Sequence, residues 1–385
     1  MGDEGGHVES IVQIKERRFE LDAVKFFAIF FMVMIHVYEY LGPYDTDHVM
    51  PDSAFRNIIE FLGGPLVAPV LMFCMGIGMV YTKHNAPVDF IRRGIKLMIM
   101  GYALNFFKLT LPQLIGKMIG IEDDFDIIGG FLLVDILTFA GAAFITIGLM
   151  RKVHLSIFAM CMIACLLQAA GIWAVNWNIE SPVLRGLAGI LLPAGFWAAF
   201  PLTLWLVYPT FGMAFGEFLK KTADKREMYK KLMIISAVLF TACTVGLVYV
   251  GYDLRRSYVI CDNLFYFQTF ISTIWSLPLI LLAISTCFFL FGPLENTKFG
   301  RLVSFSGTNL NTVFIVQWLL VSATKSTVEA MEMKLDLHPA VIVLLGLIYV
   351  AATLGITKVI KAISLRRKLK KIRLLENGSA GDGNR

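Results

Sequence analysis

Long runs of apolar residues recur along most of the chain, and each is long enough for one helix to cross a lipid bilayer. A helix rises ~1.5 Å per residue, so about 20 residues span the ~30 Å hydrocarbon layer. Only 17% of the 385 residues are charged. We therefore predict an all-α, polytopic membrane helix bundle. Its ten spans cover residues 22–41, 62–82, 90–109, 127–149, 153–175, 195–218, 232–251, 264–291, 303–323 and 339–362.

The basic residues predict the orientation of the bundle, because short cytoplasmic loops collect Lys and Arg. With the N-terminus in the cytoplasm, 27 of the 35 Lys and Arg residues fall on the cytoplasmic side. An even number of spans returns the C-terminus to that side. We therefore expect a cytoplasmic segment over 1–18, a membrane domain over 19–363 and a basic cytoplasmic tail over 364–385. We place the protein in the plasma membrane.

Residue patterns also argue against nucleic-acid binding and against disulfide or metal sites. Basic residues sit beside apolar spans, so we expect no soluble basic face for nucleic acid. The six Cys residues contain no CxxC pair, which argues against a disulfide framework and a zinc site. Acidic residues in loops 42–61 and 110–126 are typical of solvated loops, and we assign no metal site.

The first apolar segment carries the densest set of ionisable residues, which are costly in lipid and therefore functional candidates. Lys25 and His36 are 11 residues apart, so they share a helix face with ~16 Å between them along the axis. Asp22 and Glu39 lie near the same face. A cation can hold an anionic substrate, while a deeper imidazole can take a proton or carry an acyl group, with Glu39 orienting it. The alternative is a snorkelling lysine and a structural histidine.

Basic residues also open the third span, in the sequence DFIRRGIK. Arg92, Arg93 and Lys96 could pair with phosphates, or they could only anchor the helix at the membrane surface. Asp135 lies inside the fourth span and needs a cationic partner, for which we consider Arg93, Lys96 and Lys25.

Uncharged polar residues within spans are predicted to support the bundle. Asn105 in the third span and Gln168 in the fifth are typical of hydrogen bonds between helices. Asn309, Asn311 and Gln317 could form a polar track in the ninth span.

The stretch RRFELDAVKFFAIFFMVMIH resembles the opening of the transmembrane acyltransferases. These include the acyltransferase type 3 proteins, which modify bacterial surface glycans, and the heparan-α-glucosaminide N-acetyltransferase-like proteins. Their openings follow R-x-x-x-L-D-x-x-R-x(10)-H, so Lys25 stands where Arg is more common and His36 stands at the histidine. Gln317 stands where a late His is common. Four later stretches also resemble spans of this family: FIRRGIKLMIMGYALNF, GPLVAPVLMFCMGIGMVY, AFPLTLWLVYPTFGMAFGEFL and SFSGTNLNTVFIVQWLL.

The resemblance implies transfer of an acyl group, with acetyl expected, from cytoplasmic acyl-CoA to a hydroxyl or amine. The acceptor would be a carbohydrate or glycolipid on or across the bilayer. Acetyl-CoA would be a donor substrate, with no permanently bound cofactor. His36 would be the general base or a transient acyl carrier, with Glu39 as its orienter. The expected phosphate ligands are Lys25, Arg92, Arg93 and Lys96, and the expected supporting residues are Asp22, Asn105, Asp135 and Gln317.

Other functions are also compatible with these residues. A secondary transporter of an anionic metabolite or lipid intermediate would use the same inner cations. Such transporters often carry matched helix breaks in two halves, and we find no clear match between the halves. A non-catalytic membrane sensor or scaffold is the third alternative. A homo-oligomer is left open.

Overall fold

The computed structural model describes residues 18–42, 50–120, 126–177, 179–194, 198–331 and 337–381, and these ranges are helical without any strand. Six helical segments within them are long and apolar enough to cross a membrane. The all-α membrane bundle is therefore confirmed, while the count of ten spans and their orientation stay predictions. The six segments are Phe19–Leu41, Ala54–Tyr81, Leu202–Lys221, Lys225–Tyr249, Phe270–Leu294 and Pro339–Lys370.

Sixteen α-helices make up most of the described chain, with short 3₁₀ or π turns between some of them. The α-helices are α1 (Phe19–Leu41), α2 (Ala54–Gly63), α3 (Ala68–Tyr81), α4 (Pro87–Asn105), α5 (Leu111–Met118), α6 (Ile127–Phe131), α7 (Ile136–Lys152), α8 (Ile157–Trp173), α9 (Pro182–Gly189), α10 (Leu202–Trp205), α11 (Val207–Lys221), α12 (Lys225–Tyr249), α13 (Phe270–Phe291), α14 (Lys298–Thr308), α15 (Leu310–Ala330) and α16 (Pro339–Gly381). The turns are η1 (Phe106–Thr110), η2 (Ala174–Asn176), η3 (Leu254–Ser257), η4 (Leu264–Tyr266) and η5 (Gly292–Leu294).

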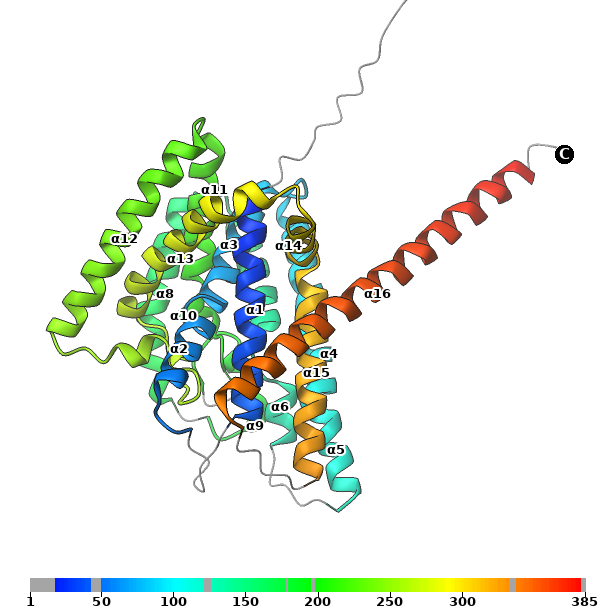
Figure 1. Ribbon diagram of the computed structural model, residues 1–385, viewed down its shortest axis with the longest axis horizontal. Coiled ribbons are helices and arrows are strands. Elements are labelled where there is room, and N and C mark those ends of the chain that lie inside the picture. The colour runs from blue at the N-terminus through cyan, green and yellow to red at the C-terminus, as the bar shows by residue number, and fades with distance from the viewer. Residues whose placement is uncertain are drawn as a thin grey trace, which may run out of the picture.

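Helix α1 forms the centre of the bundle (Figure 1). It contacts α2, α3, α13, α14, α15 and α16, and 72% of its most apolar window is buried. Helix α12, in contrast, packs mainly on α13 and is 6% buried over the same window length. In a membrane such an apolar helix faces lipid, so the polar residues of α1 are the ones enclosed by protein.

Two of the predicted spans are broken helices. The segment 127–149 divides into α6 and α7, separated by an extended stretch that ends at Asp135. Asp135 therefore lies just before α7 rather than inside a helix. Its carboxylate caps α7 by accepting the Leu137 N–H at 2.9 Å. The segment 303–323 divides at Asn309 into α14 and α15. Both breaks adjoin the cavities described below.

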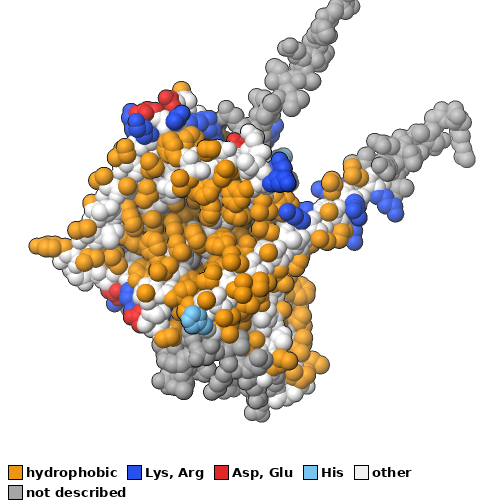
Figure 2. All heavy atoms as spheres, viewed as in Figure 1, with side chains coloured by type: hydrophobic (Ala, Val, Ile, Leu, Met, Phe, Trp, Pro, Cys, Tyr) orange, Lys and Arg blue, Asp and Glu red, His pale blue; other side chains and the backbone are white. Residues whose placement is uncertain are grey.

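The C-terminal boundary that we predicted at residue 364 lies inside a helix. Helix α16 begins at Pro339, crosses one side of α1 and continues without a break to Gly381 (Figure 1). Figure 2 shows a broad apolar surface over the bundle, with Lys and Arg gathered at one end and along the projecting part of α16. A band of this kind is typical of a protein embedded in a membrane.

Helices α3 and α11 approach each other through glycines. A Cβ atom on Gly76 would lie 2.0 Å from the carbonyl oxygen of Pro209, and one on Gly212 would lie 2.1 Å from that of Phe73. Small residues of this kind let two membrane helices pack backbone against backbone. The α3–α11 contact therefore has no room for a side chain at either position.

We expect Gly76→Ala to lower the free energy of unfolding by about 1–3 kcal/mol, because α11 must move away to accommodate the methyl group. Gly78→Ala on the same helix is the control, since a Cβ there meets nothing within 4 Å. Thermal unfolding of the purified variants in detergent measures the difference. A Gly76 variant as stable as the Gly78 variant would contradict this packing.

Candidate active site

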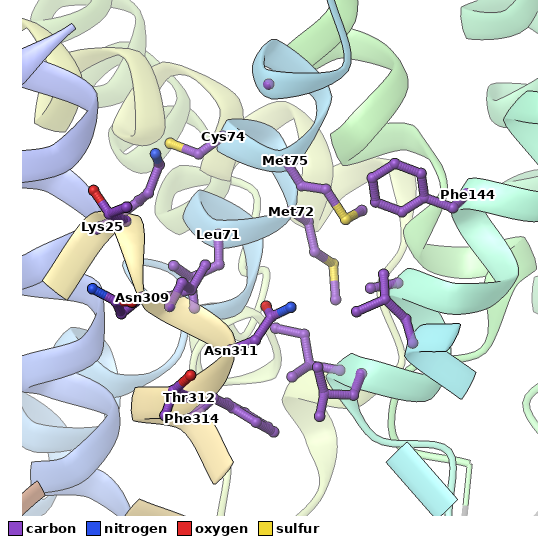
Figure 3. A pocket seen from close by; sticks show the side chains of 18 of the residues that line it. Lys25, Leu71, Met72, Cys74, Met75, Phe144, Asn309, Asn311, Thr312 and Phe314 are labelled. Carbon is purple, nitrogen blue, oxygen red and sulfur yellow. The ribbon is translucent and has the colours of Figure 1, made fainter. Parts of the chain in front are cut away.

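The first of two neighbouring cavities is basic and lies at the end of the bundle where α1 begins. It has a volume of about 380 Å³. Lys25 of α1, Arg93 of α4 and Lys361 of α16 line it, and we call it the basic cavity. Its uncharged walls include Asn309 and Asn311. Figure 3 shows the amino group of Lys25 beside Cys74, while the Asn311 side chain reaches toward the middle of the cavity.

The cations of the basic cavity are held by different contacts. Lys25 pairs with Asp22 at 3.5 Å, and α14 packs closely against that carboxylate, since a Cβ on Gly307 would lie 2.6 Å from it. The Arg93 guanidinium lies 4.5 Å from the ring centre of Phe144. Sequence reasoning missed Lys361, because we counted it only as a charge that orients the tail.

The predicted cluster of Arg92, Arg93 and Lys96 does not converge on one site. Arg92 lines a separate cavity of about 230 Å³, which it shares with Arg93. Lys96 is exposed, and the basic cavity does not include it. Helix α4 turns Gly94 and Leu97 toward α7, so Arg93 flanks the buried stripe while Lys96 lies farther around the helix.

The second cavity lies deeper in the bundle and contains the histidine of α1, so we call it the histidine cavity. Its volume is about 170 Å³. His36 and Glu39 line it together with Lys108 and Asp135. Aromatic residues complete the wall: Tyr40, Phe200, Phe265, Tyr266, Phe314 and Trp318. The Lys25 and His36 ends of α1 border two different cavities.

Two apolar residues line both cavities. They are Ile136, the first residue of α7, and Phe314 of α15. Because each residue follows one of the helix breaks, those breaks bring the walls of the two cavities together. The basic and histidine cavities are thus neighbours with a shared apolar wall, which we call the partition.

The His36 ring is held by Gln317 and Trp318. Its Nδ1 lies 3.1 Å from the Gln317 side-chain oxygen, and its ring centre lies 4.0 Å from that of Trp318. In the tautomer that carries its proton on Nδ1, the ring donates to this oxygen and Nε2 is the unprotonated nitrogen. Gln317 therefore performs the orienting that we had expected of Glu39, whose own role as orienter stays a prediction.

Asp135 pairs with a residue that sequence reasoning missed. Its Oδ2 lies 3.0 Å from the Nζ of Lys108, so Arg93, Lys96 and Lys25 were the wrong partners. We had counted Lys108 only as a charge at the outer end of the third span, but the π turn Phe106–Thr110 continues the helix and buries this lysine. The signal was present in NFFKLTL, where the apolar run continues on both sides of the charge.

Asn105 supports the segment that leads to Asp135. Its side-chain amide donates to the carbonyl oxygens of Phe131 at 3.1 Å and Leu133 at 2.8 Å. The extended stretch before α7 would otherwise leave these carbonyls unpaired inside the bundle. Asn105 thus bonds to the broken segment between α6 and α7, whereas we had expected a bond between two helices.

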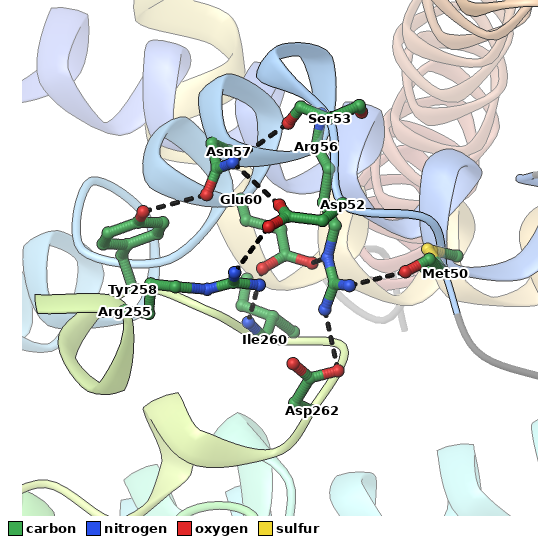
Figure 4. Close-up of polar contacts among 10 residues, drawn as sticks. All are labelled: Met50, Asp52, Ser53, Arg56, Asn57, Glu60, Arg255, Tyr258, Ile260 and Asp262. Atoms are coloured by element: carbon green, nitrogen blue, oxygen red, sulfur yellow. Dashed lines mark hydrogen bonds and ion pairs between the residues drawn. The ribbon is translucent and has the colours of Figure 1, made fainter. Parts of the chain in front are cut away.

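A buried ion-pair network, which we call the outer clamp, holds one wall of the histidine cavity (Figure 4). Arg56 of α2 donates to Glu60 at 3.0 Å, to Asp262 at 2.7 Å and to the carbonyl oxygen of Met50 at 2.6 Å. Glu60 in turn accepts the backbone N–H of Ile260 at 3.2 Å. Because Ile260 lines the cavity, the clamp fixes the segment that carries this part of the wall.

Comparison with known proteins decides the family. The family model for the acyltransferase domain of type 3 proteins matches residues 18–357. The chain belongs to the acyltransferase type 3 family. The match runs from α1 into α16 and includes the residues that line the histidine cavity. No curated protein and no solved structure gives a significant match.

As a member of the acyltransferase type 3 family, the protein is a membrane acyltransferase. The resemblance inferred from the opening of α1 is thereby confirmed. Membership favours acyl transfer over the transporter and scaffold alternatives.

Among the described residues, Cys, His, Asp and Glu form no group of three that could hold a metal ion. Six acidic or histidine residues of the two predicted loops lie outside the described residues: Asp45, Asp47, His48, Glu122, Asp123 and Asp124.

Proposed function

We propose that this acyltransferase moves an acyl group, in the first place acetyl, from cytoplasmic acyl-CoA to a hydroxyl or amine of a carbohydrate-like acceptor. The observation that carries the proposal is the pair of neighbouring cavities. One is basic and suits the phosphates of CoA, and the other contains an oriented imidazole. The partition of Ile136 and Phe314 is where the acyl end of the donor would pass between them.

The basic cavity suits a phosphorylated donor because its cations come from three different helices. Lys25, Arg93 and Lys361 can surround an anionic group, and charged hydrogen bonds to phosphate are among the strongest that proteins make. Asn309 and Asn311 can bond to amide groups such as those of the pantetheine arm. In the predicted orientation this cavity faces the cytoplasm, where acyl-CoA is found.

Chemistry in the histidine cavity follows from the free Nε2 of His36. This nitrogen takes the proton of the acceptor hydroxyl as the hydroxyl oxygen attacks the thioester carbonyl carbon. The C–S bond then breaks, and the proton passes from the imidazolium to the departing thiolate. Gln317 keeps the ring in the tautomer that this step requires. In a second route the imidazole itself accepts the acyl group, which peptide mass spectrometry of quenched enzyme would detect.

The acceptor would enter the histidine cavity from the opposite side of the membrane. Tyr40 and Tyr266 offer aromatic rings with polar edges, which suit contact with a sugar ring. We place the enzyme in the plasma membrane, where glycolipid and surface-glycan acceptors are exposed.

Release of free CoA from labelled acetyl-CoA by purified protein in detergent tests the donor assignment. We expect turnover that depends on His36 and increases when a sugar acceptor is added. Folded protein that leaves acetyl-CoA intact would reject CoA as the donor. If the same protein in vesicles carried an anionic metabolite across the bilayer, the transporter alternative would be favoured instead.

Neutralising a cation of the basic cavity is expected to weaken donor binding more than turnover. A hydrogen bond to a charged group contributes about 1.5–3 kcal/mol, so Arg93→Ala and Lys361→Ala should each raise the KM for acetyl-CoA roughly tenfold or more. Lys96→Ala is the matched control, because Lys96 lies on the same helix as Arg93 but does not line the basic cavity. Equal KM values in all three variants would show that the donor phosphates do not bind in the basic cavity.

A further inference from the structure

The histidine cavity contains a buried cation that the proposed chemistry has not yet used. Lys108 is 3% exposed and lines the same cavity as His36. A charged amine within a membrane bundle is costly and is retained where it has a partner or a function. The burial of Lys108 in the same cavity as His36 was not predicted from the sequence.

The Lys108 ammonium is held rigidly by two neighbours. Asp135 accepts one N–H through Oδ2 at 3.0 Å, and its other oxygen caps α7. The Nζ also lies 3.9 Å from the ring centre of Trp318, the residue that packs on His36. The hydrogen bond to Asp135 uses one of the three N–H groups of the ammonium, so donor capacity remains for a ligand in the cavity.

The backbone around Lys108 is also unusual. The residue lies within η1, a π turn between α4 and α5, and such turns are frequent at functional sites. Its carbonyl oxygen accepts a hydrogen bond from the Ser322 hydroxyl of α15. Backbone and side chain are therefore both fixed against the helix that contributes Gln317 and Trp318.

We propose that the Lys108 ammonium donates a hydrogen bond to the carbonyl oxygen of the acyl group during transfer. When the acceptor oxygen adds to the carbonyl carbon, the C=O electron pair moves to that oxygen, and the fixed cation stabilises the resulting oxyanion. When the C–S bond breaks, the C=O bond reforms and the thiolate leaves. This proposal rests on acyl transfer at His36, but it holds for any donor with an activated carbonyl.

The first test compares turnover in three purified variants. Lys108→Met should lower kcat for acyl transfer about 100-fold with little change in the donor KM, as loss of one oxyanion donor does in other enzymes. Lys108→Arg keeps the charge and should retain more activity. Lys117→Met is the control, because Lys117 is exposed on α5, immediately after the π turn.

The double variant K108M/D135N separates catalysis from folding. It removes both charges, so no unpaired carboxylate is left buried and the protein should be as stable as the wild type or nearly so. If Lys108 stabilises the oxyanion, the double variant stays about 100-fold slow despite its stability. Recovery of the rate in the double variant would overturn the proposal and assign the lysine to structure alone.

The second test does not depend on CoA. Diethyl pyrocarbonate is a small neutral acylating reagent whose carbonyl carbon is attacked by the imidazole nitrogen, with monoethyl carbonate as leaving group. We expect His36, located by peptide mass spectrometry, to be modified several-fold more slowly in Lys108→Met than in Lys117→Met. An equal or faster rate would overturn the role of Lys108. If wild-type protein does not react with acyl-CoA, the proposed donor is wrong. The rate of His36 modification still tests the role of Lys108 in that case.

Discussion

Replacing His36 with alanine is expected to lower acyl transfer by about 100- to 10,000-fold, as loss of a general base usually does. The ring is the proposed base in the histidine cavity, and its Nδ1 faces the Gln317 oxygen. Donor binding should survive, because the cations that would hold the phosphates line the other cavity. The measurement is the transfer rate alongside the acetyl-CoA affinity in the same preparation.

His84→Ala is the matched control for this prediction, since His84 is exposed in the loop between α3 and α4. Glu39→Gln should cost less than His36→Ala if Glu39 only orients the site. Near-wild-type transfer by the His36 variant would refute the mechanism. Loss of both transfer and donor binding would indicate a structural histidine.

Arg56→Met is expected to lower the free energy of unfolding by about 3–5 kcal/mol, because it leaves buried Glu60 without its cation. The side chains of Arg56 and Glu60 are 3% and 0% exposed. Since Glu60 also holds the backbone of Ile260, the wall of the histidine cavity should loosen at the same time. Chemical or thermal unfolding in detergent measures the change in stability, and acceptor KM reports on the cavity.

The chain supplies a matched control for the outer clamp in Arg255→Met. Arg255 pairs with Asp52 at 2.8 Å, but the two side chains are 34% and 62% exposed. The Asn57 amide and this guanidinium hold the pKa of Asp52 below its ordinary value. An exposed pair adds little to stability, so the Arg255 variant should unfold close to the wild type. Equal losses in the two variants would show that burial of the clamp has no energetic consequence.

The central helix was predictable because its signal is local. A single apolar run sets the length of α1, and the 3.6-residue period places Lys25 and His36 on one side. The partners of those residues were not predictable in the same way. Gln317 lies 281 positions from His36, and a hydrogen bond across that separation follows from helix packing, which the sequence period does not encode.

The broken helices explain the other errors. Hydropathy measures how apolar a segment is but does not show that a short stretch within it leaves the helix, so 127–149 was predicted as one span. With Asp135 placed in a continuous helix, its partner was sought among the charges near the cytoplasm. The break instead turns its carboxylate toward Lys108, which we had counted only as a charge at the outer end of the third span.

The apolar partition of Ile136 and Phe314 would also keep ions from leaking across the membrane through the two cavities. An apolar constriction sheds water and thereby blocks ions, while an uncharged fragment such as an acetyl group can pass it. The charged part of the donor would stay on its own side, so no charge would cross the transmembrane field. Acylation of an external acceptor would then be driven by cleavage of the thioester alone, and it would proceed equally well in an energised and a de-energised cell.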